Sequence, residues 1–502
     1  MERFQIILIA VYTACLLYMT IFSLIQLGLL KEFRKKRKDN KPLPPLTSED
    51  PHPMVTIQLP LFNEIFVVER LIDYIMKINY PKDKLEIQVL DDSTDDSVQL
   101  AINKVNHYKN LGYNIKHIHR TDRSGYKAGA LKEGMKHAEG EFIAIFDADF
   151  LPEPDFLIKA MPYFHNDKIG VVQTRWEHLN EDYSLLTKLQ AFQLNVHFTV
   201  EQAGRCAAGH FLQFNGTAGI WRRTAIDEAG GWHSDTLTED LDLSYRAQLK
   251  GWKIQYVEDI ICPAELPAEI YGLKSQQFRW MKGGAENTRK LLPTILKADL
   301  PASIKFHSAM HLMASGIFFI ILWVGILSVP VLWAMDDLGL KATFMGFCLL
   351  GTLAVMSVFY EANVMMCWKE KGVTNRFWKF VMLFPLFMAV SMGFSLHNSI
   401  AVIQGYWGKK SSFVRTPKMN ILNVQDKLKS NQYVIQKIDL TLIAEALFFC
   451  YFVFAIGLGV YLEYFAFMLF HILLLTGFGI NFFYSPVSYT HLDVYKRQDY
   501  KF

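Results

Sequence analysis

Cysteine is scarce in this chain of 502 residues, and its placement excludes the sites that cysteine usually builds. The six cysteines are scattered, no two form a C-x-x-C pair, and several fall in apolar runs. A cysteine-based metal centre or a disulfide framework needs close, regular spacing. We therefore expect these cysteines to be reduced and to serve in packing.

A concentrated basic surface and an intramembrane ion pathway are also missing. The net charge is only +3, and no basic cluster is interleaved with aromatic residues, so we expect no nucleic acid partner. Ionisable residues are rare in the apolar runs, with Glu445 and His471 as exceptions that we interpret as packing or interfacial residues. A transporter that carries a nucleotide-sensing domain is therefore poorly supported.

Long apolar runs are abundant, and the first occupies residues 1–30. It exceeds the roughly 20 residues that span a bilayer. The basic residues that follow it should stay in the cytoplasm. A cleaved signal peptide would have its basic end first and a shorter apolar region, so we expect an uncleaved membrane helix followed by a basic, proline-rich cytoplasmic linker, residues 31–53.

Further apolar runs follow the central part of the chain. Four of them suit spanning helices, at residues 309–333, 342–364, 440–461 and 464–484. A fifth, at 379–404, has basic segments on both sides, so a single crossing would place one of them outside. We expect this run to lie along the interface or to re-enter the membrane.

The membrane part of the chain therefore has four predicted regions. Residues 486–502 break from the apolar pattern and resemble a tail found on truncated, automatically assembled sequences, so we expect them to be non-native and without function. The regions are interfacial and transmembrane helices at 291–404, a cytoplasmic loop at 405–438, two transmembrane helices at 439–485 and this tail.

Residues 54–290 have the alternation of apolar strands and polar, helix-compatible segments that is typical of an open α/β sheet. Ligand sites in such sheets lie at the carboxyl ends of the strands. Four predicted strands end in polar or ionisable residues, which predicts a single cleft. These strands are residues 55–59, 86–90, 114–118 and 142–146.

Asp147 and Asp149 follow the last of these strands and are two residues apart, so their carboxylates can project to the same side. Such a pair can hold a hard divalent cation, Mg²⁺ or Mn²⁺, which neutralises a diphosphate leaving group. A solvated acidic loop is the ordinary alternative.

Two other polar segments fit a nucleotide. Asp91 and Asp92 could accept hydrogen bonds from a base or ribose, although Asp-Asp-Ser also suits a turn. In residues 120–131, Lys127 and two arginines surround a glycine before a predicted helix, which suits a diphosphate. A solvated basic loop is the alternative for the second segment.

The last two segments suit an acceptor. Glu239 and Asp240 open a predicted helix, where acidic residues are common, and Asp240 is our candidate for the base that an inverting glycosyl transfer needs. Gln276, Arg279 and Trp280 share one helical face, with an indole for a sugar and a guanidinium for a phosphate. An amphipathic helix on the membrane is a compatible alternative.

Taken in order, these motifs resemble those of the family 2 glycosyltransferases that include cellulose and mannan synthases. Residues 125–131, 214–222 and 413–418 further resemble the cellulose-synthase-like branch that makes mannan or xyloglucan backbones. The resemblance implies a GT-A type nucleotide-sugar-binding domain with an open mixed sheet, joined to transmembrane helices. It also implies an interfacial helix before a gating-type loop that closes over the donor and contains Phe413, Arg415, Thr416 and Lys418.

The resemblance also assigns roles to the residues named above. Asp91 and Asp92 belong to the donor site, where Asp91 contacts the base, while Lys127 and Arg279 contact the diphosphate. Asp147 and Asp149 hold the metal, and Asp240 is the catalytic base. Trp280, Gln276 and Glu239 bind the acceptor.

The implied function is an inverting, metal-dependent transfer of a hexose from a nucleotide diphosphate sugar, UDP-glucose or GDP-mannose, to the non-reducing end of a β-linked glucan or mannan that is then secreted. The alternative is a non-processive transferase with a lipid acceptor. We expect a bacterial inner membrane location with the catalytic domain in the cytoplasm. Bacterial cellulose synthases usually carry more N-terminal spans than the single one predicted here, and because no cyclic-dinucleotide regulatory domain is recognised after the last predicted helix, we do not expect activation of that kind.

Overall fold

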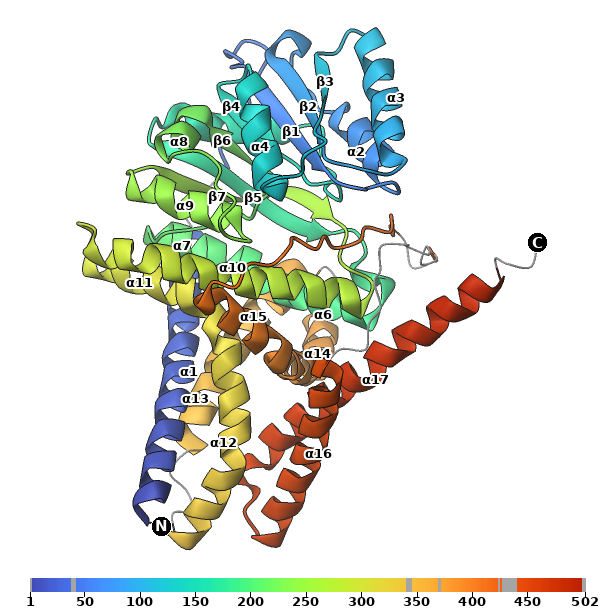
Figure 1. The fold of residues 1–502 in the computed structure, drawn as a ribbon. Coiled ribbons are helices and arrows are strands. Elements are labelled where there is room, and N and C mark those ends of the chain that lie inside the picture. The colour runs from blue at the N-terminus through green and yellow to red at the C-terminus, as the bar shows by residue number, and fades with distance from the viewer. Residues whose placement is uncertain are drawn as a thin grey trace.

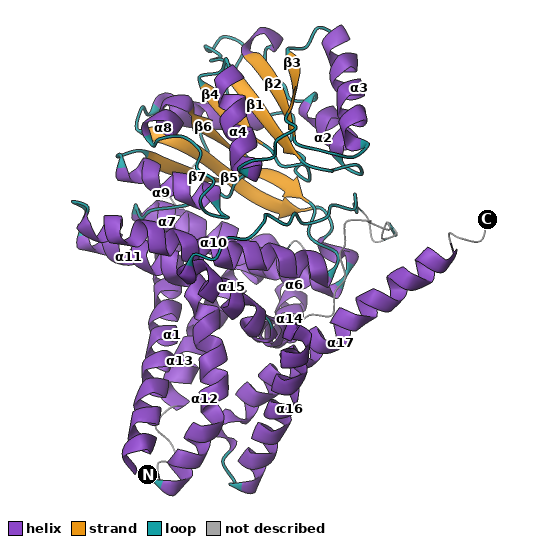
Figure 2. Ribbon diagram, viewed as in Figure 1, coloured by secondary structure: helices purple, strands orange, loops and turns teal. Residues whose placement is uncertain are grey.

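Seven strands among the described residues form one mixed sheet, drawn in the upper part of Figures 1 and 2. Their order is β3-β2-β1-β4-β6-β5-β7, and β6 runs antiparallel to β4 and β5. The predicted open mixed α/β sheet is thereby confirmed. The strands are β1 (Val55–Leu61), β2 (Leu85–Asp91), β3 (Ile115–His119), β4 (Phe142–Ile145), β5 (Ile169–His178), β6 (Gly219–Arg222) and β7 (Lys253–Ala264).

The central strands are buried along their whole length, as expected for parallel strands that helices cover on both faces. Polar residues inside this sheet are paired with one another: the Thr56 hydroxyl donates to Glu86 at 2.6 Å, and the Gln58 amide donates to Gln88 at 3.0 Å. The helices of this domain are α2 (Val68–Ile75), α3 (Ser97–Asn110), α4 (Tyr126–His137), α5 (Phe156–Ala160), α8 (Arg223–Glu228) and α9 (Glu239–Leu249).

A layer of helices lies between the sheet and the long helices below it (Figure 1). Its two longest packed members approach closely, because a Cβ on Gly405 of α15 would lie 2.6 Å from the Lys282 carbonyl oxygen of α10. The layer consists of α6 (Leu185–Val196), a π-helix (His197–Glu201), α7 (Gln202–Ala208), α10 (Ile270–Lys297), α11 (Ala302–Leu312) and α15 (Ser395–Trp407).

The chain is an integral membrane protein, because the described residues contain six helical segments long and apolar enough to cross a bilayer. The run predicted to lie at the interface, 379–404, is divided between α14 and α15, and α14 is one of the six. The long helices are α1 (Glu2–Arg37), α12 (Ile317–Asp337), α13 (Met345–Tyr360) with a π-helix (Glu361–Cys367), α14 (Val373–Gly393), α16 (Leu440–Tyr461) and α17 (Met468–Gln498).

This computed structural model describes residues 2–37, 42–339, 345–368, 372–422, 425–426 and 440–498. The predicted loop 405–438 is described through residue 422 and at 425–426, so the rest of it lies outside the described residues. Of the predicted tail, residues 486–498 belong to α17 and 499–502 lie outside the description. Within the described residues, five cysteines are free thiols, in agreement with the sequence prediction.

The backbones of helices α14 and α17 are in direct contact, and this contact fixes the position of α17 relative to α14. A Cβ on Gly477 would lie 2.0 Å from the Ala389 carbonyl oxygen, and one on Gly393 would lie 2.4 Å from the Gly477 backbone. Small residues at a helix crossing in a membrane allow such an approach, and van der Waals packing then stabilises the pair.

Gly477→Ala should therefore force α14 and α17 apart and destabilise the protein by about 1–3 kcal/mol, as overpacking does. The measurement is the melting temperature of the detergent-solubilised protein by fluorescence-detected size exclusion. Gly457→Ala in α16 is the matched control, since a Cβ there meets nothing within 4 Å. Equal melting temperatures for the two variants would contradict the close crossing.

Candidate active site

Most of the polar residues predicted to meet at the carboxyl ends of the strands, with Asp91 as an exception, line two adjoining cavities. Cavity A is lined by Glu64, Asp92, Arg123, Arg415 and Thr416, among others. Cavity B is lined by Trp176, His178, Asn215, Glu239, Asp240, Gln276 and Trp280, among others. Both cavities share Lys127, Asp147, Asp149, Arg279, Phe413 and Lys418.

Asp91 and Asp92 end β2 but have different surroundings. Asp92 lines cavity A and receives two hydrogen bonds from the Arg120 guanidinium, at 2.7 and 2.5 Å. Asp91 lines neither cavity, is 1% exposed, and has His117 Nε2 at 2.9 Å from its Oδ2. Burial would raise the pKa of Asp91, but hydrogen bonds from His117 and Ser93 hold it below its usual value.

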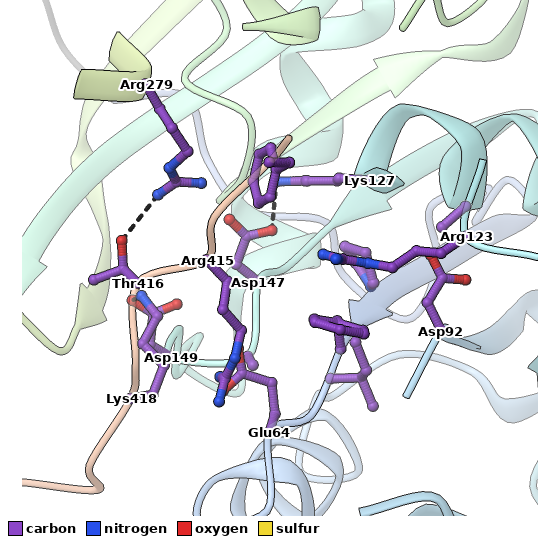
Figure 3. Close-up of a pocket in the computed structure, with 16 residues that line it drawn as sticks. Glu64, Asp92, Arg123, Lys127, Asp147, Asp149, Arg279, Arg415, Thr416 and Lys418 are labelled. Atoms are coloured by element: carbon purple, nitrogen blue, oxygen red, sulfur yellow. Dashed lines mark hydrogen bonds and ion pairs between the residues drawn. The ribbon is translucent and has the colours of Figure 1, made fainter. Parts of the chain in front are cut away.

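Lys127 connects the acidic residues of the two cavities. It lies in the first turn of α4, after Gly125, whose φ of +71° favours glycine. Its Nζ donates to Asp147 Oδ1 at 2.5 Å and to the Gly216 carbonyl at 2.9 Å (Figure 3). Burial would lower the pKa of Lys127, but the charges of Asp147, Glu239 and Asp240 raise it, so the ammonium form is stable there.

Asp147 and Asp149 are the predicted metal ligands, and their surroundings fit a hard cation. Asp149 Oδ1 is buried without a hydrogen-bond partner, while its Oδ2 is paired with the Lys418 ammonium. A cation bound by carboxylate oxygens would satisfy this atom. The two tight ligand clusters among the described residues lie elsewhere, at Asp91, His117 and His119 and at His233, Asp235 and Asp242.

Glu239 and Asp240 form the first turn of α9 and enter cavity B together. Burial raises the pKa of Asp240 to about 7, and the adjacent Glu239 charge adds to this effect. Burial also raises the pKa of Glu239, against the lowering effect of Lys127. A carboxyl group with a pKa near neutrality can take up and release a proton under physiological conditions.

Helix α10 brings Gln276, Arg279 and Trp280 to cavity B on one face, as their spacing predicts. Arg279 also lines cavity A, and its guanidinium lies 4.4 Å from the centroid of the Phe413 ring. Burial lowers the pKa of Arg279, against the charges of Glu239 and Asp147. Arg279 Nε is buried and unpartnered, which leaves a donor for an anionic ligand.

The segment 413–418 lies inside cavity A, far along the chain from the sheet (Figure 3). Arg415 pairs with Glu64 at 2.7 Å, and Thr416 accepts a hydrogen bond from Arg279 at 2.9 Å. The Phe413 ring stacks on Tyr126 with centroids 5.8 Å apart. Phe413 and Thr416 thus contact the predicted donor residue Arg279, whereas Lys418 contacts the predicted metal ligand Asp149 and Arg415 contacts Glu64.

Several residues of the site were not singled out from the sequence. Glu64 is buried, and burial raises its pKa to about 7 despite the charge of Arg415. Glu64 lies in the polar segment that follows the predicted strand 55–59, so its position was a weak signal. Trp176, His178 and Asn215 line cavity B, and each has a buried polar atom without a partner. β5, which carries the first two, was not predicted, whereas Asn215 lies in a motif noted only for its resemblance.

Comparisons with known proteins agree with this geometry. A family profile described as "Glycosyltransferase like family 2" matches residues 51–283, which contain the strands and most of the site. "Glucomannan 4-beta-mannosyltransferase 1" from Oryza sativa subsp. japonica is 45% identical over 264 residues, covering 50% of this chain and 51% of the relative. The chain spans about half the length of several such relatives.

Two longer matches extend beyond the sheet. The mannosyltransferase from Pyrobaculum calidifontis in complex with GDP-Man and Mn²⁺ shares the fold, with a TM-score of 0.50 and 21% identity over 82% of this chain and 99% of that one. "Probable glucomannan 4-beta-mannosyltransferase 11" from Oryza sativa subsp. japonica is 37% identical over 406 residues, covering 78% of this chain and 67% of the relative. At that identity and coverage, the chain belongs to the family 2 glycosyltransferases.

Proposed function

We propose that this protein transfers mannose from GDP-mannose to the non-reducing end of a growing β-1,4-linked mannan, with inversion at the anomeric carbon. The observation that carries the proposal is the meeting of Lys127, Asp147, Asp149 and Arg279 between two cavities, one of which also contains Asp240 and Trp280. A phosphate-binding group and a base beside an aromatic sugar platform are what this reaction needs.

The names of the relatives support the choice of sugar and linkage. The plant relatives are described as glucomannan 4-beta-mannosyltransferases, and the archaeal mannosyltransferase was solved with GDP-Man and Mn²⁺. The plant origin of the curated relatives gives no support to the predicted bacterial inner membrane. We retain the proposal that the catalytic domain faces the cytoplasm, because basic residues follow the first membrane helix.

In the proposed mechanism, Asp240 takes the proton from the attacking acceptor hydroxyl as that oxygen bonds to the anomeric carbon. The bond from this carbon to the diphosphate breaks at the same time, and the nucleoside diphosphate leaves with the electron pair. Lys127 and Arg279 stabilise its negative charge. A Mg²⁺ or Mn²⁺ ion on Asp147 and Asp149 would supply further neutralisation of the leaving group.

The remaining predicted residues have positions that suit substrate binding and closure of the site. Trp280 would stack on the terminal acceptor sugar, with Gln276 and Glu239 beside it, and Asp92 would face the nucleotide from the wall of cavity A. Asp91 lines neither cavity. Segment 413–418 would act as a lid, since four of its residues line cavity A and exclusion of water prevents donor hydrolysis. The membrane helices would carry the polymer away.

The first test is a donor screen on protein in nanodiscs, with Mn²⁺ or Mg²⁺ and with GDP-mannose or UDP-glucose. GDP release and mannan formation are expected with GDP-mannose. Asp240→Asn should reduce turnover by at least about 10³-fold, since the base is lost, while GDP binding and the melting temperature are kept. A lipid-linked product without polymer would instead identify the non-processive enzyme, and turnover by Asp240→Asn would exclude Asp240 as the base.

The pH dependence follows from the buried position of Asp240. A base acts in its ionised form, so a pKa of about 7 predicts that kcat/KM falls as the pH decreases below about 7, by about tenfold per unit. The measurement is initial-rate kinetics between pH 5 and 9, expected to give a rising acid limb. A flat profile down to pH 5 would show that no group with a raised pKa serves as the base.

Glu64→Gln should release segment 413–418, because Arg415 loses its buried carboxylate partner. Trypsin cleavage after Lys410, Arg415 and Lys418 is expected to become about tenfold faster, as measured by mass spectrometry over time. Glu69→Gln is the matched control, since Glu69 is exposed and pairs only loosely with Lys104 at 4.0 Å. Equal cleavage rates would refute the role of Glu64 in holding the segment.

A further inference from the structure

His197 lies in the π-helix between α6 and α7 and connects the half-buried carboxylate of Glu201 to Asn215 of cavity B. Its Nδ1 is 2.8 Å from Glu201 Oε2, and its Nε2 is 3.0 Å from Asn215 Oδ1. A π-helix is rare in proteins and is frequently found at functional sites. Here the π-helix places His197 and Glu201 on one side, so that the side chains of Glu201, His197 and Asn215 form a continuous hydrogen-bonded chain.

The hydrogen atoms of this series can be assigned from its partners. Glu201 is ionised, because hydrogen bonding and the charge of His197 offset the effect of burial and hold the pKa of Glu201 below its usual value. His197 Nδ1–H therefore donates to Glu201. Asn215 Oδ1 also accepts from Gln213 Nε2 at 2.8 Å, so it faces two donors and His197 Nε2 carries a hydrogen as well.

This arrangement leaves the amide nitrogen of Asn215 for a ligand. Asn215 is 9% exposed, lines cavity B, and its Nδ2 is buried without a partner. Its backbone is fixed, because its N–H donates to Gln173 Oε1 at 2.8 Å and the next carbonyl, that of Gly216, accepts from Lys127. A Cβ on Gly216 would lie 3.1 Å from Asp240 Oδ2, so this segment is close to the proposed base.

We propose that Asn215 Nδ2 donates a hydrogen bond to an oxygen of the acceptor glycan in cavity B, and that Glu201 and His197 are positioning residues that keep this amide nitrogen turned toward the cavity. The proposal rests on the proposed function, since it names an acceptor contact of that site. Without a hydrogen on His197 Nε2, the amide would turn its nitrogen to the imidazole and present its oxygen instead.

The positioning pair also contacts the first membrane helix. Gln26 of α1 hydrogen-bonds to Glu201, and a Cβ on Gly204 of α7 would lie 2.5 Å from the Leu29 carbonyl of α1. The orientation of Asn215 therefore depends on contacts that begin in the membrane domain.

The test is a double-mutant cycle with full-length protein in nanodiscs, using GDP-mannose and β-1,4-linked mannohexaose. Asn215→Ala and His197→Phe should each raise KM for mannohexaose by about tenfold, with little change in kcat or in GDP affinity. The KM of the double variant should not exceed the higher of the two single-variant values, because His197 acts only through Asn215. His137→Phe, an exposed histidine in α4, serves as the control.

Multiplying effects in the double variant, or an unchanged KM in Asn215→Ala, would overturn the proposal. If His197→Phe does not fold, Glu201→Gln replaces it in the cycle with the same expectation. Binding of mannohexaose to the Asp240→Asn protein by calorimetry separates the two hypotheses. Weaker binding in the Asn215 and His197 variants supports the contact even if no donor gives polymer, whereas polymer with unchanged binding supports the function and refutes the contact.

Discussion

The buried ammonium group of Lys127 is the interaction on which the arrangement of the site depends. It is bonded to Asp147 and to the Gly216 carbonyl, and it lies close enough to Glu239 and Asp240 to stabilise their charges. Buried carboxylates repel one another unless a cation lies among them. Helix α4, the end of β4 and the start of α9 are therefore tied electrostatically as well as by packing.

The same requirement explains why basic residues from distant parts of the chain enter the site. Lys418 neutralises Asp149, Arg415 neutralises Glu64, and Arg279 faces both cavities from α10. A nucleotide diphosphate would bring further negative charge, which these cations can share. Segment 413–418 thus occupies cavity A in the described state through contacts that a charged ligand would replace.

The sequence predicted the parts of the site that depend on local order. Asp147, Asp149 and Asp240 follow strands or open helices, so the period of apolar residues and the end of an element were enough to place them. The three strands β5, β6 and β7 were not predicted. For β6 the reason is its length, because a four-residue strand is defined by its partners rather than by its own pattern. Asp91 was expected to contact the nucleotide base, but it lines neither cavity and its carboxylate is hydrogen-bonded to His117.

The contacts that join distant segments could not be read from residue spacing. Two such contacts are Glu64 with Arg415 and Asn215 with His197. In the sequence these four polar residues have no feature that pairs them, because only the fold brings them together. Their roles become visible only from burial and from the partners that each atom lacks.

The close packing of Gly405 against the Lys282 carbonyl has a mechanical consequence. Helix α10 carries Gln276, Arg279 and Trp280, and α15 is continuous in the chain with the membrane helix α14. Because no side chain separates the two backbones at this point, we expect α10 and α15 to move together as one rigid unit. Lateral pressure and thickness of the lipid bilayer would therefore act, through α14 and α15, on the helix that brings Trp280 to cavity B.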